Sequence, residues 1–298
     1  WKPSTRSLRR AGRRTVELTR DNYYTPEVDW EYMSCSQYQA WNECEARELA
    51  ILQGRWQPEE KEAFLVGNYF HTHFESPEAH EQFCNEHFDK IFKTKTIKGK
   101  GGAPDKMIQT AENDEVIQSL VGLPGENEMI MHGKLFGVPW RIRLDKYVPD
   151  GRMIIDYKTV ANIGELKRSD ELHEKVTFID AYGYMMRAAV YSEIEKQYAG
   201  SKEDPQFIII AISKQDPPDK DVLSLNHRQR YDYELEKIAK RLPMIQMIKE
   251  GRAKPKRRGY CDYCRATKKL WGIRPYYSLM PEFREEREDD AAAELRPE

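Results

Sequence analysis

The sequence predicts an α/β fold in which helices cover a central β-sheet, and three stretches support this prediction. Residues 128–159 show the alternation of three strands joined by turns. Residues 177–200 have the apolar spacing of a long helix, and residues 206–213, QFIIIAIS, suit a strand that is buried on both faces. A long patterned helix between strands is what a covered sheet requires.

The first third of the chain is predicted to be helical. The expected helices span residues 33–54, 59–75 and 77–92. Ser34 or Ser36 is the expected start of the first helix, because serine is favoured at helix N-termini. The segment 93–106 is rich in lysine and glycine, and we expect a mobile loop there.

The turns and the remaining helices follow from proline and glycine positions. One strand turn is expected near Phe136 and Gly137, and the other at residues 148–151, VPDG, whose Asp-Gly pair favours a tight turn. Gly200 is the expected end of the helix in residues 177–200. A last helix is expected over residues 227–251, interrupted at Pro243.

The composition limits the classes of function. The 298 residues carry a net charge of -2, which argues against a protein that coats nucleic acid with its whole surface. Basic residues nevertheless gather in residues 1–20, 93–106 and 249–258, and such patches can follow a phosphate backbone. We find neither a secretory leader nor an apolar run of about 18 residues, so no membrane association is expected. The five cysteines favour a reducing cytoplasm.

The composition also indicates the organisation of the chain. Residues 1–15 are expected to be a flexible basic arm that need not be native. Residues 16–278 are expected to form one domain. Residues 279–298 are strongly acidic and are predicted to be a disordered tail.

Charged side chains stand in two strands where apolar ones are expected. The stretch RIRLDKYVPDGRMIIDYKT contains Asp145, Asp156 and Lys158. A hairpin at VPDG would place Asp145 near Ile154 and diagonal to Asp156, on one face and about 7 Å apart. Carboxylates this close resist joint ionisation unless a cation lies between them, and oxygen ligands favour Mg²⁺ or Mn²⁺. Alternatively, the two aspartates lie on a solvent-exposed face with basic partners.

These residues and two others resemble a known family. Gly67 with His71 forms a GxxxH pair, and Asp145, then Asp156-Tyr157-Lys158, then a strongly patterned helix follow in order. This set resembles the PD-(D/E)xK nuclease superfamily, above all the phage and prophage recombination exonucleases of the exodeoxyribonuclease VIII and lambda exonuclease type. The resemblance covers residues 16–278 and implies a restriction-endonuclease-like core with a mixed central sheet flanked by helices.

The resemblance also implies roles for these residues. His71, Asp145, Asp156 and the carbonyl of Tyr157 would bind Mg²⁺, which Mn²⁺ could replace. Lys158 would orient or deprotonate the attacking water. The chemistry would be a metal-assisted in-line attack on a phosphodiester.

A second predicted set would contact the DNA phosphates. Its members are Ser34, Ser36, Thr159, Arg187 and Tyr191. The two serines resemble the Ser-x-Ser helix start of the family and could bind a phosphate at the helix N-terminus, or simply cap the helix. The family usually has glutamine at the position of Arg187, although arginine can also bind a phosphate.

The function that the resemblance implies is a Mg²⁺-dependent exodeoxyribonuclease. It would resect linear double-stranded DNA ends from 5′ to 3′ and leave 3′ single strands for a single-strand annealing protein. A ring-shaped homo-oligomer, trimeric or tetrameric, in the cytoplasm of a bacterial host would fit this activity. The alternatives are a DNA repair or CRISPR-linked nuclease with an iron–sulfur cluster, and a non-catalytic DNA-binding scaffold.

The cysteines decide how much weight the iron–sulfur alternative receives. Related nucleases hold a cluster with one N-terminal and three C-terminal cysteines. This chain offers Cys44, Cys261 and Cys264, so the third C-terminal ligand is missing. Cys35 could in principle be a fourth ligand, but it lies about two and a half helical turns from Cys44. Because three soft ligands make a weak cluster site, we expect no iron–sulfur cluster or zinc and interpret these residues as ordinary thiols.

Overall fold

The computed structural model describes residues 16–59, 62–93, 102–169, 173–270, 272–273 and 275–280. The chain divides into two compact units, Trp1–Arg258 and Gly259–Glu298. The predicted basic arm, residues 94–101 of the predicted loop, and residues 281–298 of the predicted tail lie outside the described residues. Within the described residues, no helix has the length and apolar character needed to cross a bilayer.

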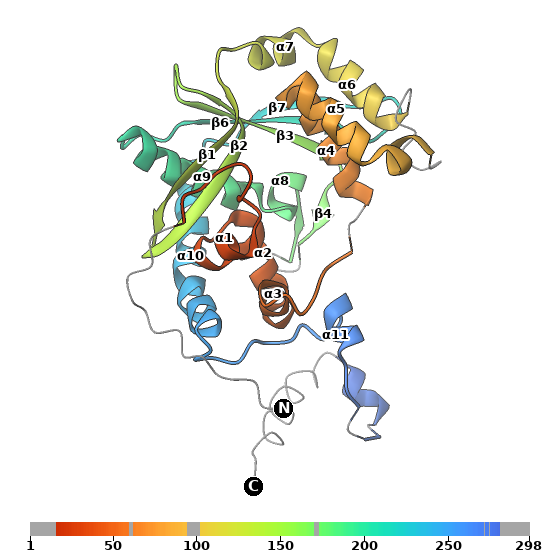
Figure 1. Ribbon diagram of the computed structural model, residues 1–298, viewed down its shortest axis with the longest axis vertical. Helices are drawn as coiled ribbons and strands as arrows, with labels where there is room; N and C mark the ends of the chain where they lie inside the picture. The colour runs from red at the N-terminus through yellow and green to blue at the C-terminus, as the bar shows by residue number, and fades with distance from the viewer. Residues whose placement is uncertain are drawn as a thin grey trace. The chain divides into compact units, whose positions relative to one another are not determined.

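The first unit is built on a five-stranded mixed sheet, as the resemblance implied (Figure 1). The strands are β1 (Glu126–Leu135), β2 (Val138–Val148), β3 (Met153–Val160), β6 (Gln206–Ser213) and β7 (Lys220–Ser224), in the spatial order β1-β2-β3-β6-β7. β1, β2 and β3 form an antiparallel meander, β3 and β6 are parallel, and β7 is antiparallel to β6. A separate hairpin pairs β4 (Lys167–Arg168) with β5 (Lys175–Val176).

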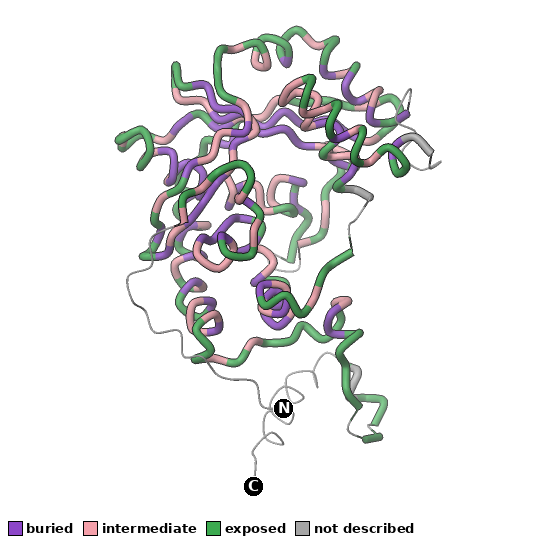
Figure 2. Tube along the Cα trace, viewed as in Figure 1, coloured by how far each residue is buried: buried purple, intermediate pink, exposed green. Residues whose placement is uncertain are grey.

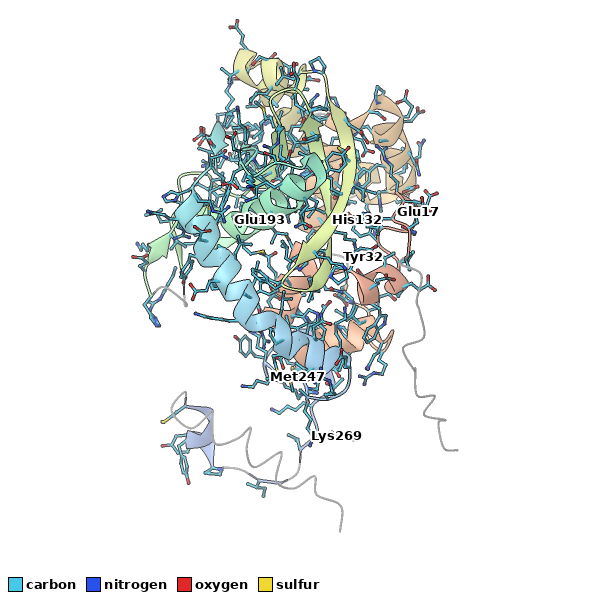
Figure 3. The ribbon with its side chains drawn as sticks, turned by 90° about the vertical axis from the view of Figure 1, so that its left-hand side faces the viewer. Glu17, Tyr32, His132, Glu193, Met247 and Lys269 are labelled. Atoms are coloured by element: carbon cyan, nitrogen blue, oxygen red, sulfur yellow. The ribbon has the colours of Figure 1, made fainter. Side chains whose placement is uncertain are left out.

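Helices cover both faces of this sheet. In chain order they are α1 (Pro26–Glu31), α2 (Cys35–Glu43), α3 (Glu45–Leu52), α4 (Glu62–Glu75), α5 (Pro77–Glu86), η1 (Asp89–Lys93), α6 (Ala103–Glu112), α7 (Glu115–Val121), α8 (Phe178–Ala181), α9 (Tyr184–Ala199) and α10 (Arg228–Lys249). In Figure 3, Glu193 marks α9, Met247 marks α10 and His132 marks β1.

Two hydrophobic cores lie on opposite faces of the sheet. The first core joins the sheet to α2, α9 and α10, and the second joins it to α4, α5, α6 and α7. Alternation along β6 decides which residue enters which core: Phe207 and Ile209 belong to the first, whereas Ile210 and Ile212 belong to the second. The prediction that this strand is buried on both faces is therefore confirmed (Figure 2).

The predicted helices differ from the observed ones at four points. The helix expected over residues 77–92 ends at Glu86, and the separate π-helix η1 follows it. The helix expected over residues 33–54 is broken at Cys44, which has extended backbone angles, so α2 and α3 are separate. The helix expected over residues 177–200 is broken at Gly183, which has a left-handed φ of 69°. Pro243 does not interrupt α10, because buried residues on both sides of it, such as Leu242 and Ile245, hold the helix against the first core.

Some observed elements carried no clear signal in the sequence. The α6 and α7 helices follow the lysine-rich segment, and α6 begins at Ala103, inside the region expected to be a loop. Pro104 lies in its first turn, where a missing N–H costs nothing. The short strands β4, β5 and β7 were not expected, because elements of two to five residues are too brief to show a period.

The second unit is small in its described part. It contains α11 (Asp262–Ala266) and η2 (Tyr276–Leu279). Cys261 precedes α11, and its Sγ accepts a hydrogen bond from the backbone N–H of Cys264 at 3.4 Å. The CxxC segment is thus the start of a short helix.

Candidate active site

Asp145 and Asp156 lie where the pairing of β2 with β3 stops. The observed register pairs Tyr147 with Ile154 and Lys146 with Ile155. The expected register, with Asp145 near Ile154, is therefore wrong by two residues. If the observed register is continued by one residue pair, Asp145 lies opposite Asp156. At this position the Asp145 carboxylate replaces a backbone carbonyl as the acceptor, because its Oδ2 accepts a hydrogen bond from the backbone N–H of Tyr157 at 2.7 Å.

Lys158 brings its ammonium between the two carboxylates. Its Nζ lies 2.5 Å from Asp156 Oδ2 and 3.7 Å from Asp145 Oδ2, and it donates a hydrogen bond to the Tyr157 carbonyl at 2.8 Å. The side chain of Asp156 is 2% exposed and that of Asp145 is 16% exposed. The alternative of two aspartates on a solvent-exposed sheet face is therefore excluded.

His71 reaches the same place from α4. Its Nδ1 lies 3.4 Å from Asp145 Oδ2. One turn earlier, Gly67 faces β3, and a Cβ at Gly67 would lie 3.5 Å from Thr159 Oγ1. The GxxxH pair thus lies on the face of α4 that meets β3, as i and i+4 positions on one helix do. Thr159 faces this helix, and we see no contact of Thr159 with the carboxylates among the described residues.

The charges around Asp145 hold it in the ionised form. Burial alone would raise the pKa of this carboxyl group, but the nearby His71 and Lys158 and the Tyr157 N–H together lower the pKa below its ordinary range. A carboxylate that stays ionised while largely buried is a ready acceptor for a cation.

Arg187 approaches the site from α9. Its Nη1 lies 3.9 Å from Asp156 Oδ1 and donates to the Tyr191 hydroxyl at 3.5 Å. Tyr191 in turn donates to the carbonyl of Arg143 on β2 at 3.2 Å. Arg187 therefore belongs to the site, whereas the buried Tyr191 connects it to the sheet.

The start of α2 lies on the same side. Ser34 caps α2 by accepting the Gln37 N–H at 3.2 Å, and its hydroxyl lies 3.1 Å from the Ser36 hydroxyl. A bridge between Met33 and Trp140 holds this turn against β2. The capping interpretation of Ser34 is confirmed, and an additional phosphate contact stays a prediction.

Two further residues lie beside the site, although no sequence pattern assigns either of them a role there. Burial raises the pKa of the Cys35 thiol to about 12, and the charges that act on it are those of Arg187 and Asp156, which places Cys35 beside the site. Tyr184 begins α9, and Lys158 Nζ lies 5.6 Å from the centre of its ring. A lone cysteine and a tyrosine at a helix start have many structural uses, so spacing alone cannot mark them.

The donors at this site fit a hard divalent cation. Two carboxylates, one backbone carbonyl and one imidazole converge there, and oxygen donors are what Mg²⁺ prefers. Asp156 Oδ2 is also among the buried oxygens of the described residues that accept no hydrogen bond of good geometry, although the Lys158 ammonium is close. Asp145, Asp156, the Tyr157 carbonyl and His71 are the residues that would hold such a cation.

The predicted cysteine ligands lie in different units. Cys44 lies at the break between α2 and α3, where its Sγ accepts the Arg258 N–H at 3.5 Å. Cys261 and Cys264 belong to the second unit. The expectation that these three residues bind neither iron nor zinc stays a prediction.

Comparisons with known proteins agree with this fold. The family model described as "PDDEXK-like domain of unknown function (DUF3799)" matches residues 34–267. A solved structure from Eubacterium rectale, described as "Putative exonuclease", is 31% identical, with 89% of this chain and 98% of that chain covered and a TM-score of 0.80. A second solved structure, of SSO0001, has 14% identity, coverage of 71% and 87%, and a TM-score of 0.29, which supports no inference. No curated protein sequence matches this chain.

The mixed sheet, the two aspartates on adjacent strands and the lysine two residues later define a nuclease domain of the PD-(D/E)xK class. Within this class, the chain belongs to the PDDEXK-like family DUF3799.

Proposed function

We propose that the protein is a Mg²⁺-dependent exodeoxyribonuclease that shortens linear double-stranded DNA from its ends. The observation that carries this proposal is the convergence of Asp145, Asp156 and the Lys158 ammonium in one largely buried site. The likeness to a structure described as an exonuclease supports action at DNA ends. The intact set of charged residues weighs against a non-catalytic scaffold.

Different residues of the chain would have different roles at the site. A bound Mg²⁺ would supply Lewis-acid stabilisation of the phosphate oxygens. The Tyr157 carbonyl and Asp156 fix the Lys158 ammonium, which can therefore orient the attacking water and assist its loss of a proton. His71 holds the Asp145 carboxylate in place through its contact with Oδ2.

The start of α2 and Arg187 offer a place for a terminal phosphate. The first N–H groups of a helix attract anions, and Ser36 adds a hydroxyl there. Arg187 has a planar fork of donors that suits a phosphate, and it lies 3.9 Å from Asp156. We infer that a 5′-phosphate binds here, which would give 5′ to 3′ polarity.

The biological setting of the proposal comes from the resemblance to recombination exonucleases. Such an enzyme leaves 3′ single strands, which a single-strand annealing protein would bind. It would act as a ring of three or four copies around the DNA. Mn²⁺ would substitute for Mg²⁺, because both prefer oxygen ligands.

The proposal is tested by comparing DNA substrates in Mg²⁺. We expect a linear duplex with 5′-phosphates to be shortened from its 5′ ends and at least about tenfold faster than a duplex with 5′-hydroxyls, because one charge-assisted phosphate contact has that value. A closed circle should stay intact. Ser36→Ala should remove the preference for the 5′-phosphate, whereas Ser119→Ala on α7 should keep it. Cutting of the closed circle would contradict an exonuclease, and equal rates on the two linear duplexes would contradict the phosphate site.

A further inference from the structure

A short turn beside the active site presents an exposed aromatic ring. Tyr182 lies between α8 and α9 and is 42% exposed. Its ring centre lies 6.0 Å from that of Tyr184, whose ring centre lies 5.6 Å from Lys158 Nζ. Two aromatic side chains thus lead from the Lys158 ammonium to the surface.

The backbone of this turn is held from two sides. The Gln39 side chain of α2 donates to the Tyr182 carbonyl at 2.9 Å. Gly183 adopts a left-handed φ of 69° and approaches the Gln39 amide so closely that a Cβ would collide with it. On α8, Asp180 accepts a hydrogen bond from Arg230 of α10 at 2.5 Å. The ring of Tyr182 therefore stands on a braced support, although it is exposed.

A positive charge lies next to this ring. Lys167 of β4 places its Nζ over the Tyr182 ring, 5.6 Å from the ring centre, and 3.6 Å from the Glu165 carboxylate. An exposed aromatic face beside a cation is the arrangement with which proteins bind single-stranded nucleic acid, because the ring stacks on a base while the cation faces the phosphates. A braced ring loses little conformational entropy when a base stacks on it.

We propose that Tyr182 is the stacking surface for a nucleobase of the strand that is cleaved at Lys158. This inference rests on the proposed nuclease function and adds a requirement on the substrate. The distances from Lys158 through the two rings keep the stacked base within about three nucleotides of the cleaved bond, since each nucleotide of a stacked strand rises about 3.4 Å along the helix axis. Within this proposal the stacked base is unpaired, so the enzyme separates the last base pairs before it cuts.

The inference is tested by binding a 5′-phosphorylated oligonucleotide that carries 2-aminopurine, a fluorescent base, at its third position. Ca²⁺ replaces Mg²⁺, and the measurement ends before product is detected. We expect the wild type to quench the fluorescence, as stacking does. Tyr182→Leu should bind about tenfold more weakly and lose the quenching. Tyr182→Phe should keep both, because it retains the ring.

A matched control separates stacking from a general loss of a surface tyrosine. Tyr198 is 58% exposed at the far end of α9, so Tyr198→Leu should bind and quench as the wild type does. Melting curves should show Tyr182→Leu folded. Unchanged binding and quenching by Tyr182→Leu would overturn the inference, and so would equal losses in Tyr182→Leu and Tyr182→Phe, which would point to the hydroxyl.

A parallel cleavage assay in Mg²⁺ separates this inference from the proposed function. If the wild type cleaves linear DNA and Tyr182→Leu changes neither binding nor quenching, the nuclease function stands and only the stacking role is contradicted. A wild type that neither binds nor cleaves DNA overturns both.

Discussion

Replacing Asp156 with asparagine is expected to reduce the rate of DNA hydrolysis by about 10³-fold. The change preserves the volume of a side chain that is 2% exposed, so the core around β3 should keep its packing. It removes the negative charge that lies 2.5 Å from the Lys158 ammonium and that would bind a divalent cation. Asp145→Asn should have an effect of similar size. Initial rates on a linear 5′-phosphorylated duplex measure the loss.

The control for this prediction comes from the same hairpin. Asp150 lies exposed in the turn between β2 and β3, so Asp150→Asn should keep the rate of the wild type. Circular dichroism should show all three variants folded. A folded Asp156→Asn variant with the wild-type rate would remove this residue from the chemistry.

Glu195→Ala is expected to lower the free energy of unfolding by about 3 kcal/mol. Glu195 on α9 is fully buried, where its carboxylate accepts hydrogen bonds from the Tyr147 hydroxyl at 2.8 Å and from Arg152 Nε at 2.9 Å. The truncation leaves both donors without this acceptor and opens a cavity. We expect a loss of free energy at the low end of the range for broken buried ion pairs, because the Arg152 side chain is 24% exposed and can be hydrated again.

Urea unfolding with a second variant tests this difference. Glu236 on α10 pairs with Lys240 at the surface, where both side chains are more than half exposed. Glu236→Ala should therefore change the free energy of unfolding by less than about 0.5 kcal/mol. Equal effects of the two substitutions on the free energy of unfolding would show that the hydrogen bonds of Glu195 do not stabilise the packing of α9 against β2.

Much of the central sheet could be predicted, because its strands have a clear period. Alternation and the VPDG turn indicate β2 and β3, and a continuous apolar run indicates β6. The same alternation placed Asp145 and Asp156 on one face. It did not reveal their register, because no sequence pattern shows that the Asp145 carboxylate takes the Tyr157 N–H in place of a backbone carbonyl.

The helix break before α9 and the residues that lie beside the site could not be predicted, since both depend on contacts between segments that are distant in the sequence. The α8–α9 turn depends on Gln39, which lies far away in the sequence. Cys35 lies beside Arg187 only because a bridge from Met33 to Trp140 carries the start of α2 to the sheet. Local propensity contains no information on either contact.

The most direct test of the proposed metal-dependent site is digestion of a linear 5′-phosphorylated duplex with Mg²⁺ and, in parallel, with EDTA. In the proposed mechanism the carboxylates of Asp145 and Asp156 act through a bound divalent cation, so we expect the duplex to be shortened with Mg²⁺ and to stay intact with EDTA. Addition of excess Mg²⁺ to the EDTA sample should restore the activity. Equal degradation in both samples, or an intact duplex in both, would contradict the assignment of this site.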